Sequence, residues 1–412
     1  MKFVIVTYGT EGDTRPLAAL CRALIDAGHR AHLLADATTL GNAEMLGVPA
    51  TGLSGDIKGA MHAAGADAMS GRGKGGFGDT ARILSGIANA NTESWLRATV
   101  AAAAEGCDAI ILSGLAAFVG LSAAEYLGVP AIGTGLIPIT PTRAFASPFL
   151  RPGLVPGLLN RASHHLVDGV LWRSFRDATN AARAAVCRLP PRKKLWTEHP
   201  MLYGVSPSVL PRPDDWPANA DICGQWVAKQ PEWSPPPSLA AFLAGGAPPV
   251  YVGFGSMPSL GGHDLLGEVV TAVAGRRALF YPGWSGVDAA GLLGNFHVIG
   301  DTPHDWLFPR TALAIHHGGA GTTHSAARAG VPSVVVPFAA DQFFWAERLR
   351  RAGVAPPPVA AKHLKAPALS RCIAVAEGAD MRAAAAALGA RMAVENGLAD
   401  TVSAIEAMME RV

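Results

Sequence analysis

Residues 313–323, which read LAIHHGGAGTT, decide the fold of this chain. The apolar run predicts a buried strand, the glycines a tight turn, and the hydroxylated residues the start of a helix that continues to Ala329. Such a unit can bind anions, because unpaired backbone N–H groups and the positive end of the helix dipole converge there. The glycines let the backbone come close to a ligand.

Two familiar phosphate-binding motifs do not fit this unit. No Gly-Lys-Ser/Thr follows the glycines, and they do not read Gly-x-Gly-x-x-Gly. His316 and His317 stand there instead, and imidazole N–H groups can donate hydrogen bonds to phosphate oxygens. A tight turn with buried histidines is the plain structural alternative. The pair of histidines followed by glycines favours an anion site.

The same alternation of strand and helix runs through the whole chain. Short apolar runs predict buried parallel strands in both halves, at residues 3–7, 32–35, 108–112, 131–132, 250–252, 278–281, 298–299, 313–315 and 333–336. The phrase Gly-Val-Pro recurs at residues 47–49, 128–130 and 330–332, where glycine can close a helix and proline can lead into a strand. The sequence therefore predicts an α/β protein with two similar doubly wound halves.

Length and composition agree with two well-packed domains. The chain has 412 residues, of which 50% are hydrophobic and 16% charged, and a net charge of +2 argues against broad nucleic-acid binding. Its five cysteines are scattered without Cys-x-x-Cys spacing, which predicts free thiols in a reducing cytoplasm and no structural zinc. No secretion signal and no apolar stretch long enough to span a bilayer are seen, so we expect a cytoplasmic protein.

Composition shifts suggest how the chain is divided. The proline-rich residues 211–238 predict a linker between domains at 1–210 and 239–395, and a helix in 396–412 is expected to pack back on the first domain. The glycine-rich residues 70–78 predict a flexible, solvated loop. The aromatic-rich residues 138–200 indicate either an apolar substrate pocket or a satellite core, and both interpretations stay open.

Several of these segments together resemble a known family. They are 305–310 (DWLFPR), 316–323 (HHGGAGTT), 329–332 (AGVP) and 337–345 (PFAADQFFW), with further matches at 254–257 (FGSM) and 9–16 (GTEGDTRP). This set is similar to the signature of family 1 nucleotide-sugar glycosyltransferases, in the branch of sterol glucosyltransferases and bacterial natural-product glycosyltransferases. The resemblance implies a GT-B fold, two Rossmann-like domains facing across a cleft, with the acceptor in the N-terminal domain and the donor in the C-terminal one.

The resemblance implies a diphosphate site around the decisive turn. It assigns the diphosphate to His316 and leaves His317 to pack beneath the turn, and the other phosphate contacts it implies are Gly319, Gly321, Thr322 and, from the opposite loop, Ser256. A helix N-terminus can stabilise the leaving group electrostatically. Because the chain contains no Asp-x-Asp, we expect metal-independent transfer with a UDP-sugar or dTDP-sugar as co-substrate and no cofactor.

The family match also implies contacts to the sugar and the nucleoside. Asp341 and Gln342 match the pair that binds the donor sugar, although an isolated Asp341 would suit a helix N-cap. Trp306 and Leu307 are the candidate nucleoside contacts; the tryptophan that stacks on the base in the plant branch has no counterpart here. The segment 337–358 tilts the match towards the sterol branch, hence towards UDP and glucose.

The acceptor hydroxyl needs a base near its proton. Asp13 matches the carboxylate of the bacterial and sterol branch, with a helix cap as the structural alternative. At the start of a helix its pKa is expected to be depressed. Attack opposite the diphosphate would invert C1. Thr10, Phe145 and Trp172 are the candidate acceptor contacts.

These expectations describe an inverting O-glycosyltransferase for a lipophilic acceptor, such as a sterol or a polyketide or macrolide aglycone, with no nucleic-acid partner and only transient membrane contact. Two alternatives are weighed against it. A sugar-nucleotide epimerase of the same fold would not need the aromatic segment 138–200. A non-catalytic homologue that only binds and activates a partner would fit the loss of Asp13, of His316 or of the pair Asp341 and Gln342, and all of them are present.

Overall fold

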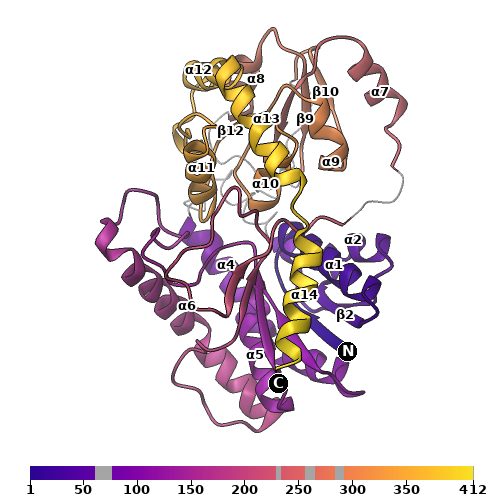
Figure 1. Ribbon diagram of the computed structural model, residues 1–412, viewed down its shortest axis with the longest axis vertical. Helices are drawn as coiled ribbons and strands as arrows, with labels where there is room; N and C mark the ends of the chain where they lie inside the picture. The colour runs from indigo at the N-terminus through magenta and orange to yellow at the C-terminus, as the bar shows by residue number, and fades with distance from the viewer. Residues whose placement is uncertain (61–76, 229–232, 256–264, 284–291, 412) are drawn as a thin grey trace.

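A computed structural model describes residues 1–60, 77–228, 233–255, 265–283 and 292–411, and of residues 77–81 only the backbone. Figure 1 shows two lobes, the first formed by the N-terminal half of the chain and the second by most of the C-terminal half. The predicted loop at 70–78 lies largely outside the described residues, apart from the start of a helix at Phe77.

The first lobe is built on a seven-stranded parallel sheet with the order β3-β2-β1-β4-β5-β6-β7. The strands are β1 (Lys2–Val6), β2 (Arg30–Asp36), β3 (Ala50–Leu53), β4 (Ala109–Leu112), β5 (Ala131–Gly135), β6 (Met201–Tyr203) and β7 (Ala220–Ile222). The main helices are α1 (Glu11–Asp26), α2 (Gly41–Met45), α4 (Phe77–Ala102), α5 (Ala117–Leu127) and α6 (Asn160–Ala182). Central strands such as β4 are buried along their whole length because helices cover both faces.

The second lobe repeats this plan with five parallel strands in the order β10-β9-β8-β11-β12. The strands are β8 (Val250–Gly253), β9 (Ala278–Tyr281), β10 (Phe296–Val298), β11 (Leu313–His316) and β12 (Ser333–Val335). The helices are α7 (Pro237–Ala244), α8 (Leu265–Val273), α9 (His304–Leu307), α10 (Ala320–Arg328), α11 (Gln342–Arg351), α12 (Ala366–Ala376), α13 (Ala379–Ala393) and α14 (Gly397–Met409). The predicted pair of doubly wound α/β halves is confirmed.

The proline-rich stretch is more than a linker. Its strand β7 pairs in parallel with β6, so the first sheet extends into the residues that were expected only to cross the surface. Proline is tolerated around such a short strand because β7 lies at the edge of the sheet, where a missing N–H interrupts no ladder.

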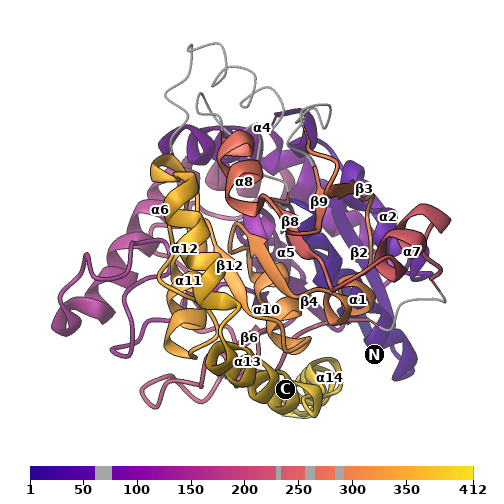
Figure 2. The same cartoon turned by 90° about the horizontal axis from the view of Figure 1, so that it is seen from above.

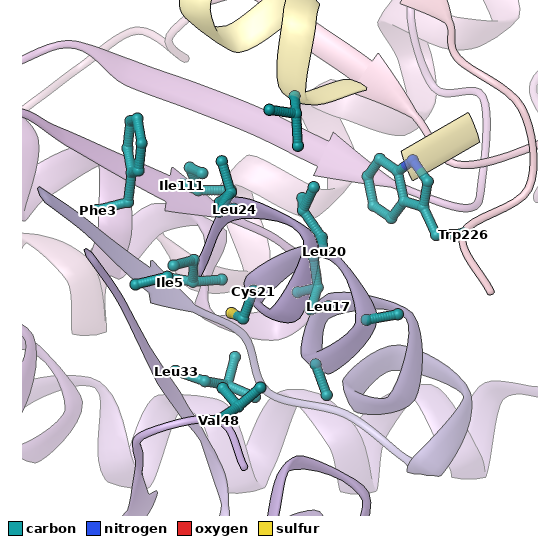
Figure 3. Close-up of a cluster of buried hydrophobic side chains, with 14 of the residues drawn as sticks. Phe3, Ile5, Leu17, Leu20, Cys21, Leu24, Leu33, Val48, Ile111 and Trp226 are labelled. Atoms are coloured by element: carbon teal, nitrogen blue, oxygen red, sulfur yellow. The ribbon is translucent and has the colours of Figure 1, made fainter. Parts of the chain in front are cut away.

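The core of the first lobe forms where α1 packs on β1. Leu17, Leu20 and Leu24 recur at helical spacing on α1 and meet Phe3 and Ile5 of the strand, as Figure 3 shows. α1 begins with a capping box, in which the side chain of Thr10 and that of the third helical residue each satisfy a backbone N–H. The packing of this helix therefore determines where the loop after β1 lies.

The last helix returns from the second lobe to the first. In Figure 1, α14 lies over the first lobe, and in the view from above α13 and α14 follow one another along one edge of the molecule (Figure 2). Val402 and Ile405 of α14 belong to the same buried cluster as the leucines of α1. The indole Nε1 of Trp226 donates a 2.7 Å hydrogen bond to Thr401 Oγ1. α14 thus covers the first lobe's core.

Truncating Ile405 to alanine should measure how much this returning helix stabilises the protein. Ile405 is fully buried, so Ile405→Ala is expected to lower the free energy of unfolding by about 2–5 kcal/mol in urea denaturation. Ser403→Ala on the same helix is the matched control, because Ser403 is exposed and such changes stay within about 0.5 kcal/mol. Equal losses for both variants would show that α14 does not anchor the first lobe.

Candidate active site

A cleft of about 2700 Å³ lies between the lobes. It is lined by residues that follow β1, β4, β8 and β11, among them Asp13, Ser113, Gly255 and His317. In each sheet these strands are the adjacent pair at which the strand order reverses. Ligands of doubly wound folds bind at the carboxyl ends of strands at this switch point. The cleft is therefore where both halves would bind their ligands.

Asp13 reaches the cleft from the third position of α1. Its Oδ2 accepts hydrogen bonds from the backbone N–H of Thr10 at 2.8 Å and from the hydroxyl of Thr10 at 3.3 Å. The helix-cap alternative is thus right for this one oxygen. Oδ1 accepts no hydrogen bond from the described residues. A Cβ on Gly9 would lie 2.2 Å from Oδ2, so only glycine leaves room for the carboxylate at this place.

The expected depression of the Asp13 pKa is wrong. Burial in the cleft raises the pKa of Asp13, and this effect outweighs the two hydrogen bonds from Thr10, which lower it. A carboxylate with a raised pKa is a stronger base than one stabilised by the helix start alone.

The two histidines exchange the roles that the resemblance assigned to them. His316 is the last residue of β11, is completely buried, accepts a 3.1 Å hydrogen bond from Gly318 N on its Nδ1, and does not line the cleft. His317 follows it and lines the cleft. Successive side chains along an extended strand point to opposite sides, so only one of the two can face the ligand. His316, to which the resemblance assigned the diphosphate, therefore does not face the cleft, and His317 does.

Two glycines leave room for the ring of His317, because they have no side chain. A Cβ on Gly255 would lie 2.8 Å from His317 Cε1, and one on Gly319 would lie 2.4 Å from its Nε2. Burial lowers the pKa of His317 to about 4, so the imidazole is neutral at neutral pH. A neutral imidazole still offers one N–H donor.

The N-terminus of α10 completes this wall of the cleft. Its N-cap is Gly319, which provides no side-chain cap, so the first N–H groups of the helix are left for another acceptor. Gly319, Gly321 and Thr322 all line the cleft beside His317. Ser256 lies outside the described residues.

Asp341 faces Asp13 across the cleft. It directly precedes α11 and makes no capping hydrogen bond, so the helix-cap alternative is wrong for Asp341. Its Oδ2 instead accepts a 3.1 Å hydrogen bond from Trp345 Nε1. Ala340 before it has φ +52°, a strained value for a residue with a side chain. Burial and, second, the charge of Asp13 raise the pKa of Asp341 to about 7.

Gln342 lines the cleft next to Asp341, but its amide oxygen already has partners. Oε1 accepts from the backbone N–H of Phe338 at 2.7 Å and of Ala339 at 3.2 Å. These bonds fix the loop between β12 and α11, so Gln342 orients the turn that carries Asp341.

The raised pKa of Asp341 makes stability depend on pH. Between about pH 4 and 7 the folded chain holds this proton while the unfolded chain releases it, so stability falls as pH rises through this window. Asp341→Asn keeps an acceptor for Trp345 and removes the titration. The free energy of unfolding of the variant is expected to exceed that of wild type by at least about 1 kcal/mol at pH 8 and by less at pH 5. Urea unfolding at both pH values tests this; a pH-independent difference would contradict it.

The predicted nucleoside contacts do not reach the cleft. Trp306 packs edge-on to Trp233 at 4.8 Å and under the guanidinium of Arg310, while Leu307 is fully buried in the second lobe's core. The short helix α9 turns its opposite side, with His304 and Asp305, to the cleft. Neither predicted residue therefore lines the cleft, whereas their neighbour His304 does.

Two of the three predicted acceptor contacts are core residues. Phe145 packs against Phe344 at 5.1 Å, and Trp172 donates its Nε1 hydrogen to Lys193 O at 3.1 Å; neither lines the cleft. Thr10 does line it. The apolar wall comes instead from other residues of the aromatic-rich segment, Ile139, Phe149, Leu171, Phe175 and Trp196. The segment 138–200 therefore forms both a pocket wall and a satellite core.

One ion pair joins the lobes beside the cleft. Arg15 Nη2 of α1 lies 3.0 Å from Asp301 Oδ2 of the second lobe and 3.6 Å from Glu11 Oε2. All three residues line the cleft.

No helix in the described part of the chain is long and apolar enough to cross a membrane.

The chain is similar in sequence to several known proteins. Residues 268–408 match the family model described as erythromycin biosynthesis protein CIII-like, C-terminal domain. The chain is 33% identical over 422 residues to O-mycaminosyltylonolide 6-deoxyallosyltransferase of Streptomyces fradiae, covering 100% of this chain and 98% of that protein. It is 30% identical to a sterol 3-beta-glucosyltransferase of Arabidopsis thaliana, covering 98% of this chain and 67% of that protein. It is 29% identical to a sterol 3-beta-glucosyltransferase of Neurospora crassa, and the matched part covers only 27% of the length of that protein.

Solved structures show the same fold. The calicheamicin glycosyltransferase CalG4 superposes with a TM-score of 0.70 at 17% identity, covering 100% of this chain and 99% of that one. Glycosyltransferase VinC superposes with a TM-score of 0.67 at 20% identity, with both chains fully covered. The expected GT-B fold is confirmed by these neighbours and by the two parallel sheets. The chain belongs to the family 1 glycosyltransferases and is a glycosyltransferase of GT-B fold.

Proposed function

We propose that this enzyme is an inverting, metal-independent O-glycosyltransferase that moves a hexose from a nucleoside diphosphate sugar to a hydroxyl group of a lipophilic acceptor. The donor is UDP-glucose by preference, with dTDP-glucose second. The observation that carries the proposal is the arrangement of one cleft, in which Asp13 of the first lobe faces Asp341 and the uncapped α10 N-terminus of the second.

In the acceptor lobe, Asp13 takes the proton. Its Oδ2 is held by Thr10, which fixes the carboxylate and leaves Oδ1 for the acceptor hydroxyl. As the hydroxyl oxygen attacks C1, its proton passes to Oδ1, and the raised pKa of Asp13 favours this transfer. Attack from the Asp13 side, opposite the diphosphate at α10, inverts the configuration at C1.

In the donor lobe, the diphosphate leaves against fixed dipoles. The N–H groups at the start of α10 and the neutral ring of His317 can donate hydrogen bonds to its developing negative charge. Asp341 can hold hydroxyl groups of the sugar in the space between Asp13 and α10, while Gln342 keeps its turn in place.

The acceptor class follows from the apolar wall and from the relatives. The side chains of Phe149, Phe175 and Trp196 line the acceptor side of the cleft and suit a large apolar ring system. The two relatives are named for transfer to a sterol and to a tylonolide derivative, so a sterol or a macrolide aglycone is proposed as acceptor. All five cysteines are free, in keeping with a cytoplasmic enzyme that meets membranes only transiently.

The test is transfer by the purified chain in the presence of EDTA. UDP-glucose and dTDP-glucose are offered with sterol, flavonoid and macrolide acceptors, and the anomeric configuration of the product is read by NMR. Transfer that survives EDTA and gives the inverted anomer is expected. Retention at C1, or activity only with a divalent metal, would overturn the mechanism. Binding of neither nucleotide in calorimetry would overturn the assigned donor.

A further inference from the structure

An acidic side chain lies where the apolar wall of the acceptor side of the cleft ends, on a helix whose Arg161 and His165 line the cleft as well. Asp168 of α6 lines the cleft and shares one face of the helix with Leu171 and Phe175, three and seven residues further on, which line it too. Leucine and phenylalanine at this spacing would be continued by another apolar residue in an ordinary pocket wall. Packing of the helix does not explain a carboxylate at this position.

No described residue satisfies this carboxylate. His164, one turn earlier on the same face, places its two ring nitrogens 3.1 Å from the carbonyl oxygens of Ile139 and Phe145, so it is engaged elsewhere. Neither a hydrogen bond nor an ion pair joins Asp168 to any part of the described chain. Burial raises the pKa of Asp168 to about 6, with no neighbouring cation to lower it.

A second acid on the cleft wall shows the contrast. Asp215 accepts hydrogen bonds from the hydroxyl of Thr142 and from the backbone N–H of Arg143 at 2.8 Å. These bonds lower the pKa of Asp215 and give it a structural role. Asp168 is part-buried and makes no such hydrogen bond within the described chain.

We propose that Asp168 binds a protonated amine on the acceptor, so that the enzyme prefers lipophilic acceptors carrying a basic amine in addition to the hydroxyl group that receives the sugar. The inference rests on the proposed function and concerns the same cleft. A cation is favoured over a second hydroxyl group because it neutralises the charge of the carboxylate, whereas a hydroxyl group leaves that charge uncompensated. Leu171 and Phe175 beside Asp168 lower the local polarity on one side of such a pair, which strengthens it.

The test compares two acceptors that differ only in charge, a neutral 3-hydroxysteroid and the same steroid with a tertiary amine on its side chain. Asp168→Asn keeps the shape of the side chain and removes its charge. Asp177→Asn on the same helix is the matched control, since the Asp177 side chain is 89% exposed. For each protein, kcat/KM is measured for both steroids, and their binding is measured by calorimetry in the presence of UDP.

Wild type and Asp177→Asn are expected to prefer the amine, and Asp168→Asn to lose about 10- to 100-fold in kcat/KM and affinity for the amine alone. Transfer to the neutral steroid and UDP binding report the proposed function separately and should not change. Equal losses for both steroids, no preference in wild type, or binding of neither steroid would overturn the inference. So would a lower melting temperature of Asp168→Asn at pH 8, which would reveal a structural partner.

Discussion

Replacing Asp13 by asparagine is expected to lower kcat for sugar transfer by about 10²- to 10⁴-fold, the contribution typical of a general base. The substitution is close to isosteric. The side-chain oxygen of asparagine can still accept from the backbone N–H of Thr10, so the start of α1 is preserved. The amide nitrogen then occupies the position of Oδ1 and cannot take a proton. The loss should therefore fall on kcat and leave donor binding intact.

Single-turnover rates with saturating donor measure this loss, and calorimetry with UDP checks donor binding. Asp26→Asn is the matched control, an exposed acid on the same helix paired with Arg22. The pH profile adds a second readout. Wild-type kcat should fall at low pH as Asp13 is protonated, and its raised pKa moves this limb upwards from the usual carboxylate range. A variant that keeps a tenth of wild-type kcat would show that another group is the base.

Apolar runs in the sequence located the central strands of both sheets, although they did not reveal β6 and β7. Strands buried on both faces read as unbroken apolar runs, so β4 and β11 could be located from Ile110, Ile111 and Ile315 without any knowledge of their neighbours. The resemblance to a known family, and not periodicity, was what predicted that Asp13, Gly319 and Asp341 share one cleft, and all three line it.

The direction in which a side chain points is harder to predict than the strand or helix that carries it. A shift of one residue along a strand turns a side chain to the opposite face, and this separates His316 from His317. α9 has only four residues, and which side it buries depends on Trp233, about 70 residues earlier in the chain. Adjacent residues there gave no periodic signal that could have distinguished Trp306 from His304.

Electrostatic surroundings were also set by distant segments. The helix start alone would depress the pKa of Asp13, but burial between the lobes outweighs it. Asp341 has its pKa raised partly by Asp13, although 328 positions separate them in the chain. His164, one turn before Asp168 on α6, likewise has its ring nitrogens beside the carbonyl oxygens of Ile139 and Phe145, and so it makes no contact with the carboxylate. These effects of burial and of distant charges can be seen only in the folded chain.

Replacing His317 by alanine is expected to lower kcat by about 10²- to 10³-fold, as removal of one preorganised donor at a developing anion does. The pKa of about 4 means that the ring acts as a neutral donor, so this loss should not vary between pH 6 and 8 through ionisation of His317 itself. His317→Gln keeps an N–H donor and should recover part of the rate.

His316→Gln separates the two histidines. His316 is completely buried and accepts from Gly318 N within the turn, so its replacement should lower the melting temperature and leave kcat of the folded enzyme within about threefold of wild type. His317→Ala should do the opposite, because the ring faces the cleft and its loss removes a ligand contact. Thermal unfolding and single-turnover rates, measured on both variants, decide between them. Loss of UDP binding in His316→Gln with an unchanged melting temperature would return the diphosphate contact to His316, and the placement of His317 between Gly255 and Gly319 would then be structural only.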